Sequence, residues 1–301
     1  MKRGLAGTAV VVVCLLGVGA ASGGPAKPKP KPKKPPPPAI RLNTKSPDVL
    51  VLTAPGYRLT LSKENGEVLE LLDRRTGTEL LRGQNGCVWA AKQPAGVATS
   101  GCSFGRTGAN RFSYRWSQAS TTLTLGYDAE PGSVDATVTI VARPSSFDMR
   151  LALESDVEYS LSAVLFPADL LVNATDVDAG YTPTFLPGVR LLPGFFSGPH
   201  RNVETYPSRW AFADFLAADI GGSHLAMYSV NPLPSPIAPV DLGFMRNVAP
   251  APCSGPSFCT THVFQTWVPR GGGWTSPTVT IRVGGSVEQS LAAYREDNRI
   301  D

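Results

Sequence analysis

The sequence predicts an all-β fold, a large antiparallel sandwich of two sheets, with a short helix at its C-terminal end. Three observations lead to this prediction. From residue 48 onward, short runs alternate apolar and polar residues with a period of two, as at Tyr57, Leu59 and Leu61. Turn-forming residues separate these runs at short intervals, and a helical pattern occurs only near the C-terminus. Many short strands divided by turn signals are typical of sandwiches and barrels.

The first 22 residues have the pattern of a secretory signal peptide. Lys2 and Arg3 precede an uncharged run over residues 5–21, which ends in small residues. This order is typical of a segment that is cleaved after export. The alternative is a retained membrane anchor, although a spanning helix needs about 20 apolar residues and this run is slightly shorter. We expect a secreted or cell-envelope, extracytoplasmic protein that meets a membrane only through this segment.

Residues 23–42 are predicted to form a linker rich in Lys and Pro. Proline removes backbone donors and fixes φ, and neighbouring lysines repel one another, so the segment favours an extended polyproline II spacer. A stalk through a charged wall polymer and a simple solubilising linker remain alternative interpretations.

The positive charge of the chain is concentrated in these N-terminal segments. Seven of the 28 Lys and Arg residues precede position 35, where there is no acidic residue, so 21 cations remain with the 24 acidic residues. The remaining chain is therefore slightly acidic. We expect no nucleic-acid partner, because binding to phosphates requires a basic face.

The predicted sandwich domain spans residues 43–285. An Asn-Gly turn at residues 65–66 joins two of its strands, since both residue types tolerate positive φ. Residues 143–146 form the turn of a second predicted hairpin. Further strands are predicted at residues 112–116, 122–127, 161–166, 223–230, 262–268 and 279–283. A second polar linker is missing from this stretch, which favours one domain over two.

Residues 286–301 are predicted to begin a helix. Ser286 and Gln289 have the spacing of a capping box, in which the two side chains satisfy free backbone donors at the helix start. Leu291, Ala292 and Tyr294 then suit a helix.

Four cysteines follow the signal segment. An even number of cysteines in an exported chain indicates disulfides. Sequence proximity favours the pairs Cys87–Cys102 and Cys253–Cys259. A zinc site is the alternative, but the short Cys-x₂-Cys spacing that such sites use is missing.

Several short motifs occur in the order found in a known family. They are the run YRLTLSKENGEVLELLDRRTGTELL at 57–81, Phe166-Pro167-Ala168-Asp169, Tyr206-Pro207-Ser208-Arg209-Trp210-Ala211, the run at 221–228, Gly273-Trp274 and Ala293-Tyr294-Arg295. With this order the chain resembles the galactose-mutarotase-like β-supersandwich at the N-terminus of large exported glycoside hydrolases of the endo-α-N-acetylgalactosaminidase type. The resemblance spans residues 49–295. It implies that the last helix leads into a (β/α)₈ barrel that carries the catalytic carboxylates, as a partner in cis or in trans.

The sequence gives little support for catalysis by this chain alone. A sugar epimerase needs a general acid and a general base, which its family supplies as Glu and His. The histidine segment of true aldose epimerases is missing, and His224 and His262 fall within predicted strands, which favours structural roles. A glycosidase needs two carboxylates that flank one bond. The sequence does not pair the available carboxylates, which are Asp169, Glu204, Asp214 and Asp219. We expect no catalytic residue, metal or cofactor.

A ligand-binding surface is predicted at residues 200–210. Pro and Gly residues indicate that residues 193–207 form a loop, and binding residues tend to lie on loops that a rigid scaffold holds. Aromatic rings can stack on sugars, and charged neighbours can bind hydroxyl groups. The candidate residues are His200, Arg201, Glu204, Tyr206 and Trp210. An alternative interpretation is that the aromatic residues belong to the core.

Three functions are compatible with these features. The first is a non-catalytic, carbohydrate-associated sandwich domain of an exported glycoside hydrolase. The second is a wall-associated glycan-binding or structural module, and the third is a mutarotase-like epimerase. The sequence favours the first, because the predicted terminal helix corresponds to a junction with a barrel in the family that the chain resembles.

Overall fold

We describe a computed structural model of the chain, in which residues 39–83, 86–168, 170–183, 188–232, 238–246 and 257–300 are described. Residues 38–301 form one compact unit. The predicted signal peptide and most of the predicted linker lie outside the described residues. The first strand of the described residues begins at Arg41, inside the predicted linker of residues 23–42. Within the described ranges, no helix combines the length and the apolar character needed to cross a membrane.

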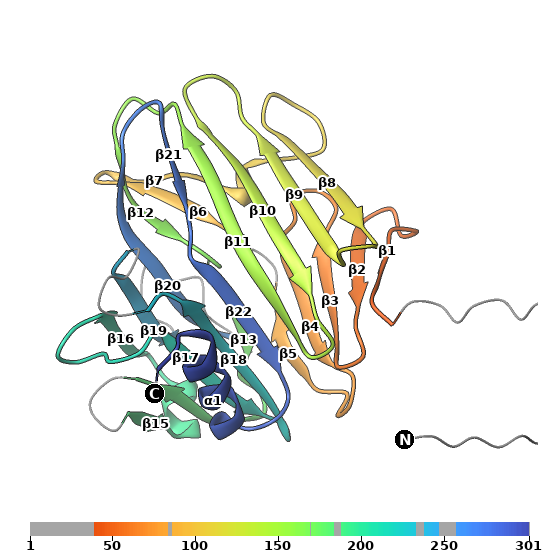
Figure 1. Ribbon diagram of the computed structural model, residues 1–301, viewed down its shortest axis with the longest axis vertical. Helices are drawn as coiled ribbons and strands as arrows, with labels where there is room; N and C mark the ends of the chain where they lie inside the picture. Colours follow the sequence, from red (N-terminus) through yellow and green to blue (C-terminus); the bar gives the residue numbers. More distant parts are fainter. Residues whose placement is uncertain are drawn as a thin grey trace, which may run out of the picture. The chain divides into compact units, whose positions relative to one another are not determined.

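One of two antiparallel sheets, here sheet A, contains twelve strands (Figure 1). Ten follow one another in the order β1-β2-β3-β4-β5-β13-β20-β12-β6-β7, while β19 pairs with β20 and β16 pairs with β19. Their bounds are β1 (Arg41–Asn43), β2 (Val49–Thr53), β3 (Tyr57–Ser62), β4 (Val68–Asp73), β5 (Glu79–Arg82), β6 (Ala90–Gln93), β7 (Gly96–Ser100), β12 (Leu161–Leu165), β13 (Leu171–Asn173), β16 (His200–Tyr206), β19 (Val240–Arg246) and β20 (Ser257–Val268).

The second sheet, here sheet B, contains ten strands. Nine follow the order β15-β14-β17-β18-β22-β11-β10-β9-β8, and β21 pairs with β11. Their bounds are β8 (Arg111–Ser117), β9 (Thr122–Asp128), β10 (Val134–Ala142), β11 (Ser146–Ser155), β14 (Val177–Thr182), β15 (Val189–Leu191), β17 (Phe215–Ile220), β18 (Ser223–Val230), β21 (Gly272–Thr275) and β22 (Thr278–Val283). Two short 3₁₀ turns, η1 (Gly101–Ser103) and η2 (Pro193–Ser197), and one helix are the other elements of the described residues.

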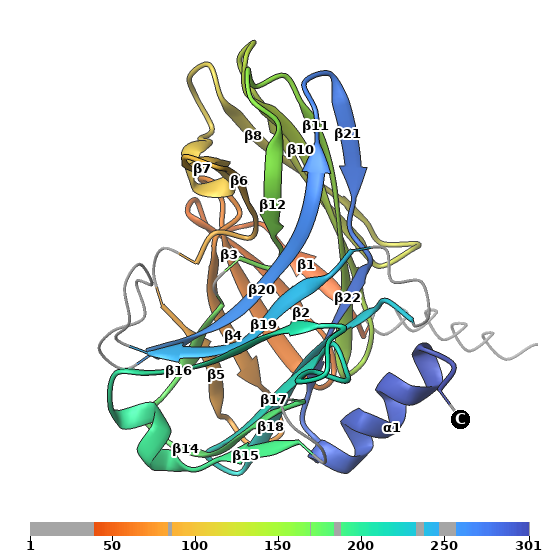
Figure 2. The same ribbon diagram turned by 90° about the vertical axis from the view of Figure 1, so that its left-hand side faces the viewer.

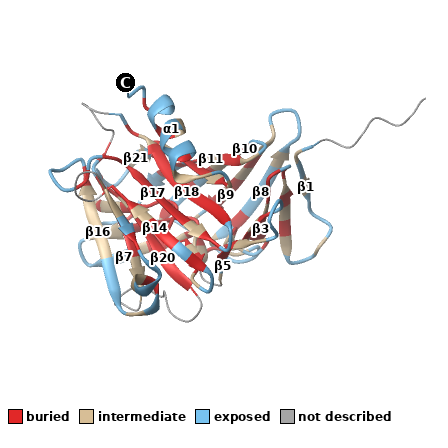
Figure 3. Cartoon of the chain, turned by 90° about the horizontal axis from the view of Figure 1, so that it is seen from below, coloured by how far each residue is buried: buried red, intermediate tan, exposed pale blue. Residues whose placement is uncertain are grey.

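The main core lies between the two sheets. Burial alternates residue by residue along β3 and β10, which confirms the period-two prediction. Tyr57 of sheet A and Phe147 of sheet B meet across this core with ring centroids 5.3 Å apart. In Figure 3, buried residues follow the strands, while exposed residues occupy many turns and the outer side of the helix. Each buried Leu or Val of this core stabilises the fold by about 1.5–3 kcal/mol.

The predicted Asn-Gly turn is confirmed and has a packing role. Gly66 has a φ of +76°, and an added Cβ there would lie 2.7 Å from the hydroxyl of Tyr127 and 2.9 Å from the ring of Phe112. The Tyr127 hydroxyl donates to the Asn65 carbonyl at 3.2 Å. Glycine therefore satisfies both the backbone conformation and the close approach of sheet B to this turn of sheet A.

The predicted C-terminal helix is also confirmed. Helix α1 (Val287–Asp297) begins after Ser286, whose hydroxyl accepts a hydrogen bond from the backbone N–H of Gln289. It lies against the outer face of β17 and β18 (Figure 2). Tyr294 is the buried anchor of this contact, with its ring centroid 5.7 Å from that of Tyr228 and 6.0 Å from that of Phe215.

The structure confirms one predicted disulfide. Cys87 and Cys102 are bonded, and the bridge closes a loop with a sequence separation of 15. Cys259 is disulfide-bonded as well. Its predicted partner, Cys253, lies outside the described residues, so the pairing of these two cysteines stays a prediction.

Candidate functional site

The predicted binding loop at residues 200–210 is largely a strand. Residues 200–206 form β16, which pairs with β19 in a continuous register from His200 opposite Arg246 to Tyr206 opposite Val240. The prediction of a loop across residues 193–207 is therefore wrong for this stretch. The Pro and Gly residues that suggested a loop lie in η2, at Gly198 and Pro199 after it, and at Pro207, on either side of the strand.

Because β16 is a strand, its side chains alternate between two faces. Glu204 lies on the core-facing side with Leu242, whereas Arg201 lies on the opposite side with Met245. His200 packs edge-on against the ring of Phe195, with centroids 5.3 Å apart.

The two aromatic candidates also differ from each other. Tyr206 is buried and its hydroxyl donates to the carbonyl of Asn231, so its ring is not available to stack on a sugar. Trp210 is 43% exposed, and its ring centroid lies 4.7 Å from the guanidinium carbon of Arg209. The structure does not bring the five predicted residues together as one surface, and a binding role for His200, Arg201, Glu204 or Trp210 stays a prediction.

One histidine joins helix α1 to sheet B. His224 lies on β18, with Nδ1 2.6 Å from Asp219 Oδ1 and Nε2 3.1 Å from the hydroxyl of Ser290. The hydroxyl of Tyr181 donates to the other oxygen of Asp219 at 2.8 Å. This connectivity is the one that nucleophilic Ser-His-Asp sites use. However, Ser290 is only 1% exposed beneath the helix, so a substrate has no path to it.

A second histidine joins the two sheets. His262 of β20 in sheet A places Nε2 2.8 Å from Oδ1 of Asp214, which immediately precedes β17 of sheet B. Its Nδ1 lies 2.6 Å from the carbonyl oxygen of Phe166, and the hydroxyl of Ser229 donates to Asp214 Oδ2. Burial lowers the pKa of His262, but the charge and hydrogen bond of Asp214 and the Phe166 carbonyl together raise it above its ordinary value. Both histidines that were predicted to be structural are buried and hydrogen-bonded.

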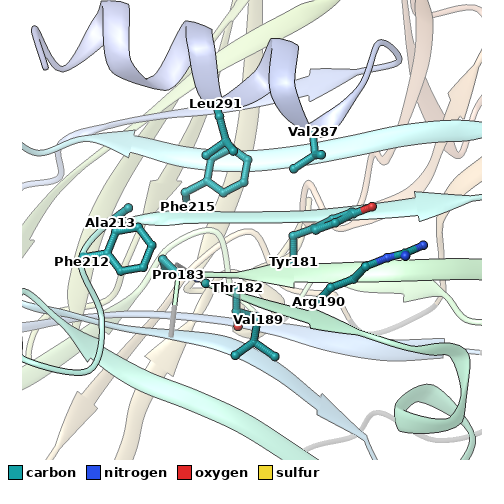
Figure 4. A pocket seen from close by; sticks show the side chains of 11 residues that line it. Tyr181, Thr182, Pro183, Val189, Arg190, Phe212, Ala213, Phe215, Val287 and Leu291 are labelled. Atoms are coloured by element: carbon teal, nitrogen blue, oxygen red, sulfur yellow. The ribbon is translucent and has the colours of Figure 1, made fainter. Parts of the chain in front are cut away.

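An apolar hollow of about 230 Å³ lies between α1, β17 and the β14–β15 hairpin (Figure 4). Val287 and Leu291 reach it from α1, and Phe215 forms part of its wall. Its other lining residues are Tyr181, Thr182, Pro183, Gly188, Val189, Arg190, Phe212 and Ala213. The sequence did not reveal this hollow, because its lining comes from segments that are far apart in the chain.

A larger, polar hollow of about 530 Å³ lies over β9, β10, β11 and β21. Asp135 and Glu154 are directly opposite each other on β10 and β11. This pair was not predicted from the sequence. Side chains that face each other on one sheet surface project in the same direction. Both carboxylates therefore line this polar hollow together.

Within the described ranges, the structure contains no group of three or more His, Cys, Asp or Glu side chains placed to hold a metal ion. Asp169, one of the carboxylates considered from the sequence, lies outside these ranges.

Comparison with known proteins identifies the fold. No protein-family model matches the sequence, and no curated protein matches it. Similar solved structures include an α-N-acetylgalactosaminidase from Bifidobacterium bifidum (TM-score 0.56, 14% identity, 82% of this chain and 38% of that chain) and a GH36 α-galactosidase from Geobacillus stearothermophilus (TM-score 0.54, 11% identity, 87% and 43%). An α-galactosidase from Lactobacillus brevis is similar as well (TM-score 0.51, 9% identity, 83% and 42%).

The chain thus spans about two fifths of the length of the enzymes that it matches. At these low identities the similarity establishes the architecture and not the activity. The chain has the galactose-mutarotase-like β-sandwich fold.

Proposed function

We propose that this chain acts as a non-catalytic, carbohydrate-associated sandwich domain that works with an exported glycoside hydrolase. One observation carries the proposal. The two described histidines that contact carboxylates, His224 and His262, are both buried and hold structural elements together. A sugar epimerase needs an acid and a base that reach the sugar, so these pairs argue against the third candidate function.

The fold supports an association with carbohydrate chemistry. The three similar structures reported above are glycosidases, of which this chain covers only a part. An exported location is supported by the signal-like residues 1–22 and by the Cys87–Cys102 disulfide, because disulfides persist in oxidising compartments.

The hollow beside α1 is the proposed contact with a catalytic barrel. Leu291 and Phe212 line it and are exposed by 38% and 42%. Large apolar side chains grouped around a hollow favour burial against another protein surface. Arg190 on its rim offers a charged group for the edge of such an interface.

Enzyme assays test the non-catalytic part of this proposal. The purified domain is expected to leave 4-nitrophenyl α-galactoside and 4-nitrophenyl N-acetyl-α-galactosaminide intact and to leave the mutarotation rate of α-D-galactose unchanged. An α-galactosidase and an aldose epimerase serve as positive controls. Turnover of any of the three substrates by the chain alone would refute a non-catalytic role.

Co-purification tests the contact with a barrel. A (β/α)₈ glycosidase encoded beside this gene, or in frame with it, is expected to bind the domain. Leu291→Asp is expected to abolish that binding, because it places a charge in the apolar hollow. Ala292→Asp is the matched control, since Ala292 is an exposed neighbour on the same helix and does not line the hollow. Equal binding by both variants would locate the interface elsewhere.

A further inference from the structure

The outer face of sheet A carries a tryptophan that is more exposed than the other large apolar side chains of the described residues. On β20, Phe264 and Val268 face the core, so Gln265 and Trp267 face away from it. Trp267 is 68% exposed. Tyr159, which is 66% exposed, lies just before Leu161, the β12 residue that pairs with Val268. The two rings therefore lie at the same end of the sheet.

A polar row crosses the sheet beside Trp267. Asp241 of β19 accepts two hydrogen bonds on its Oδ1 atom, from the Thr205 hydroxyl at 2.5 Å and from the Gln265 side-chain amide at 2.9 Å. These bonds hold the carboxylate and the amide in fixed positions. Among the described contacts, Asp241 Oδ2 and Gln265 Oε1 have no hydrogen-bond partner, so both remain able to accept one from a ligand.

The row continues onto two further strands. Gln265 is opposite Ala163 of β12, and Ala163 is opposite Lys92 of β6. The small side chain of Ala163 leaves room between the longer side chains of Lys92 and Gln265. Figure 2 shows β6, β12, β20, β19 and β16 side by side on this face, and helix α1 lies away from them.

This combination suits a pyranose ring better than other ligands. The apolar C–H face of a sugar packs on an aromatic ring, while its hydroxyl groups both donate and accept hydrogen bonds. The surface offers acceptors at Asp241 and Gln265 and a donor at Lys92. One Asp and one Lys give no net charge, which disfavours nucleic acid. The polar neighbours of Trp267 disfavour an apolar protein interface.

We propose that the outer face of sheet A binds a neutral pyranoside, with Trp267 as the stacking platform and Gln265 and Asp241 as hydrogen-bonding groups. The inference rests on the proposed carbohydrate-associated function, and it gives that function a binding surface. This surface lies apart from the hollow beside α1, so sugar binding and barrel binding are expected to be independent.

Native affinity electrophoresis in gels that contain galactomannan, arabinogalactan or dextran tests the proposal. The wild-type domain is expected to be retarded by at least one polymer, and Trp267→Ala is expected to weaken that binding roughly tenfold or more, as for other aromatic hot spots. Trp267→Phe keeps a ring and is expected to retain part of the binding. Gln265→Ala is expected to weaken it a few-fold, since a hydrogen bond contributes about 1 kcal/mol.

Tyr114→Ala is the matched control, because Tyr114 is an exposed aromatic residue on β8 of sheet B, outside this face. It is expected to bind as the wild type does, and the melting temperature of each variant confirms folding. Full binding by Trp267→Ala would overturn the inference and leave the proposed function intact. Loss of binding in Trp210→Ala alone would place the site at residues 200–210 instead. A wild-type domain that none of the polymers retards would refute both the inference and the carbohydrate association.

Discussion

The outer faces of the two sheets differ in whether another element covers them. On sheet B, α1 covers β17 and β18, where Ala217 and Ala226 are buried beside Phe215 and Tyr228. On sheet A, the face around Trp267 stays open and carries Gln265, Asp241 and Lys92. Small apolar residues let a helix approach a sheet closely, whereas long polar side chains hold neighbours away and keep water near. The size and polarity of outward-facing side chains thus separate a structural face from a binding face.

The largest expected effect comes from breaking the contact between the sheets at Asp214. Asp214→Ala leaves His262 and Ser229 buried without their carboxylate partner, and removing one member of a buried pair costs about 3–5 kcal/mol. Urea unfolding of wild type and variant at pH 5.5 measures the loss. A change below about 1 kcal/mol would contradict a stabilising role for the pair.

The pH dependence of the stability of Asp214→Ala tests the contact between His262 and Asp214 further. The folded pKa of His262 is raised above its ordinary value of 6.5, so the stabilisation from its protonated form is complete below pH 6.5. That stabilisation disappears as pH rises through the folded pKa. The difference in unfolding free energy between wild type and Asp214→Ala is therefore expected to be larger at pH 5.5 than at pH 8.5. An equal difference at both values would show that His262 does not titrate.

Removing the aromatic anchor of α1 is expected to cost about 3 kcal/mol. Tyr294→Ala leaves a cavity between the helix and the rings of Phe215 and Tyr228. Leu291→Ala on the same helix is the control and is expected to cost less than about 1 kcal/mol, since Leu291 is partly exposed. Thermal unfolding of both variants measures this contrast, and equal losses would mean that α1 is held by other contacts.

The Cys87–Cys102 disulfide contributes a similar amount at the edge of sheet A. Cys87 packs against Ala90 and Leu165 on the outer face of that sheet. A closed loop of about 15 residues is expected to stabilise the fold by about 3 kcal/mol, mainly by restricting the unfolded chain. Unfolding of the Cys87→Ser, Cys102→Ser double variant under non-reducing conditions measures this value. Equal stability of variant and wild type would refute the contribution.

Elements that depend on local residues could be predicted from the sequence. Elements that depend on pairing with distant strands could not. Gly66 and Ser286 mark a turn and a helix start through their own conformations, so the sequence around them suffices. Strand β13 has three residues and exists because β5 and β20 lie on either side of it. Strand β16 was mistaken for a loop for the same reason, since its partner β19 comes much later in the chain.

The same limit applies to the two buried histidines and to Trp267. Structural roles for His224 and His262 could be predicted because each lies within a predicted strand. Their partners could not, because Asp219, Ser290 and Asp214 approach them only after folding. Trp267 also lies in a predicted strand, but the sequence alone did not show which face of the sheet it occupies.

The smallest expected effect on stability is that of Trp267→Ala. A side chain that is 68% exposed leaves little surface to be buried by folding, so its truncation is expected to change the unfolding free energy by less than about 0.5 kcal/mol. Tyr294→Ala, by contrast, removes an aromatic side chain that is almost fully buried. Unfolding both variants in urea under the same conditions compares an aromatic residue on the open face of sheet A with one on the covered face of sheet B. If Trp267→Ala were as destabilising as Tyr294→Ala, Trp267 would be a packing residue, and the contrast between a binding face and a structural face would fail at its central residue.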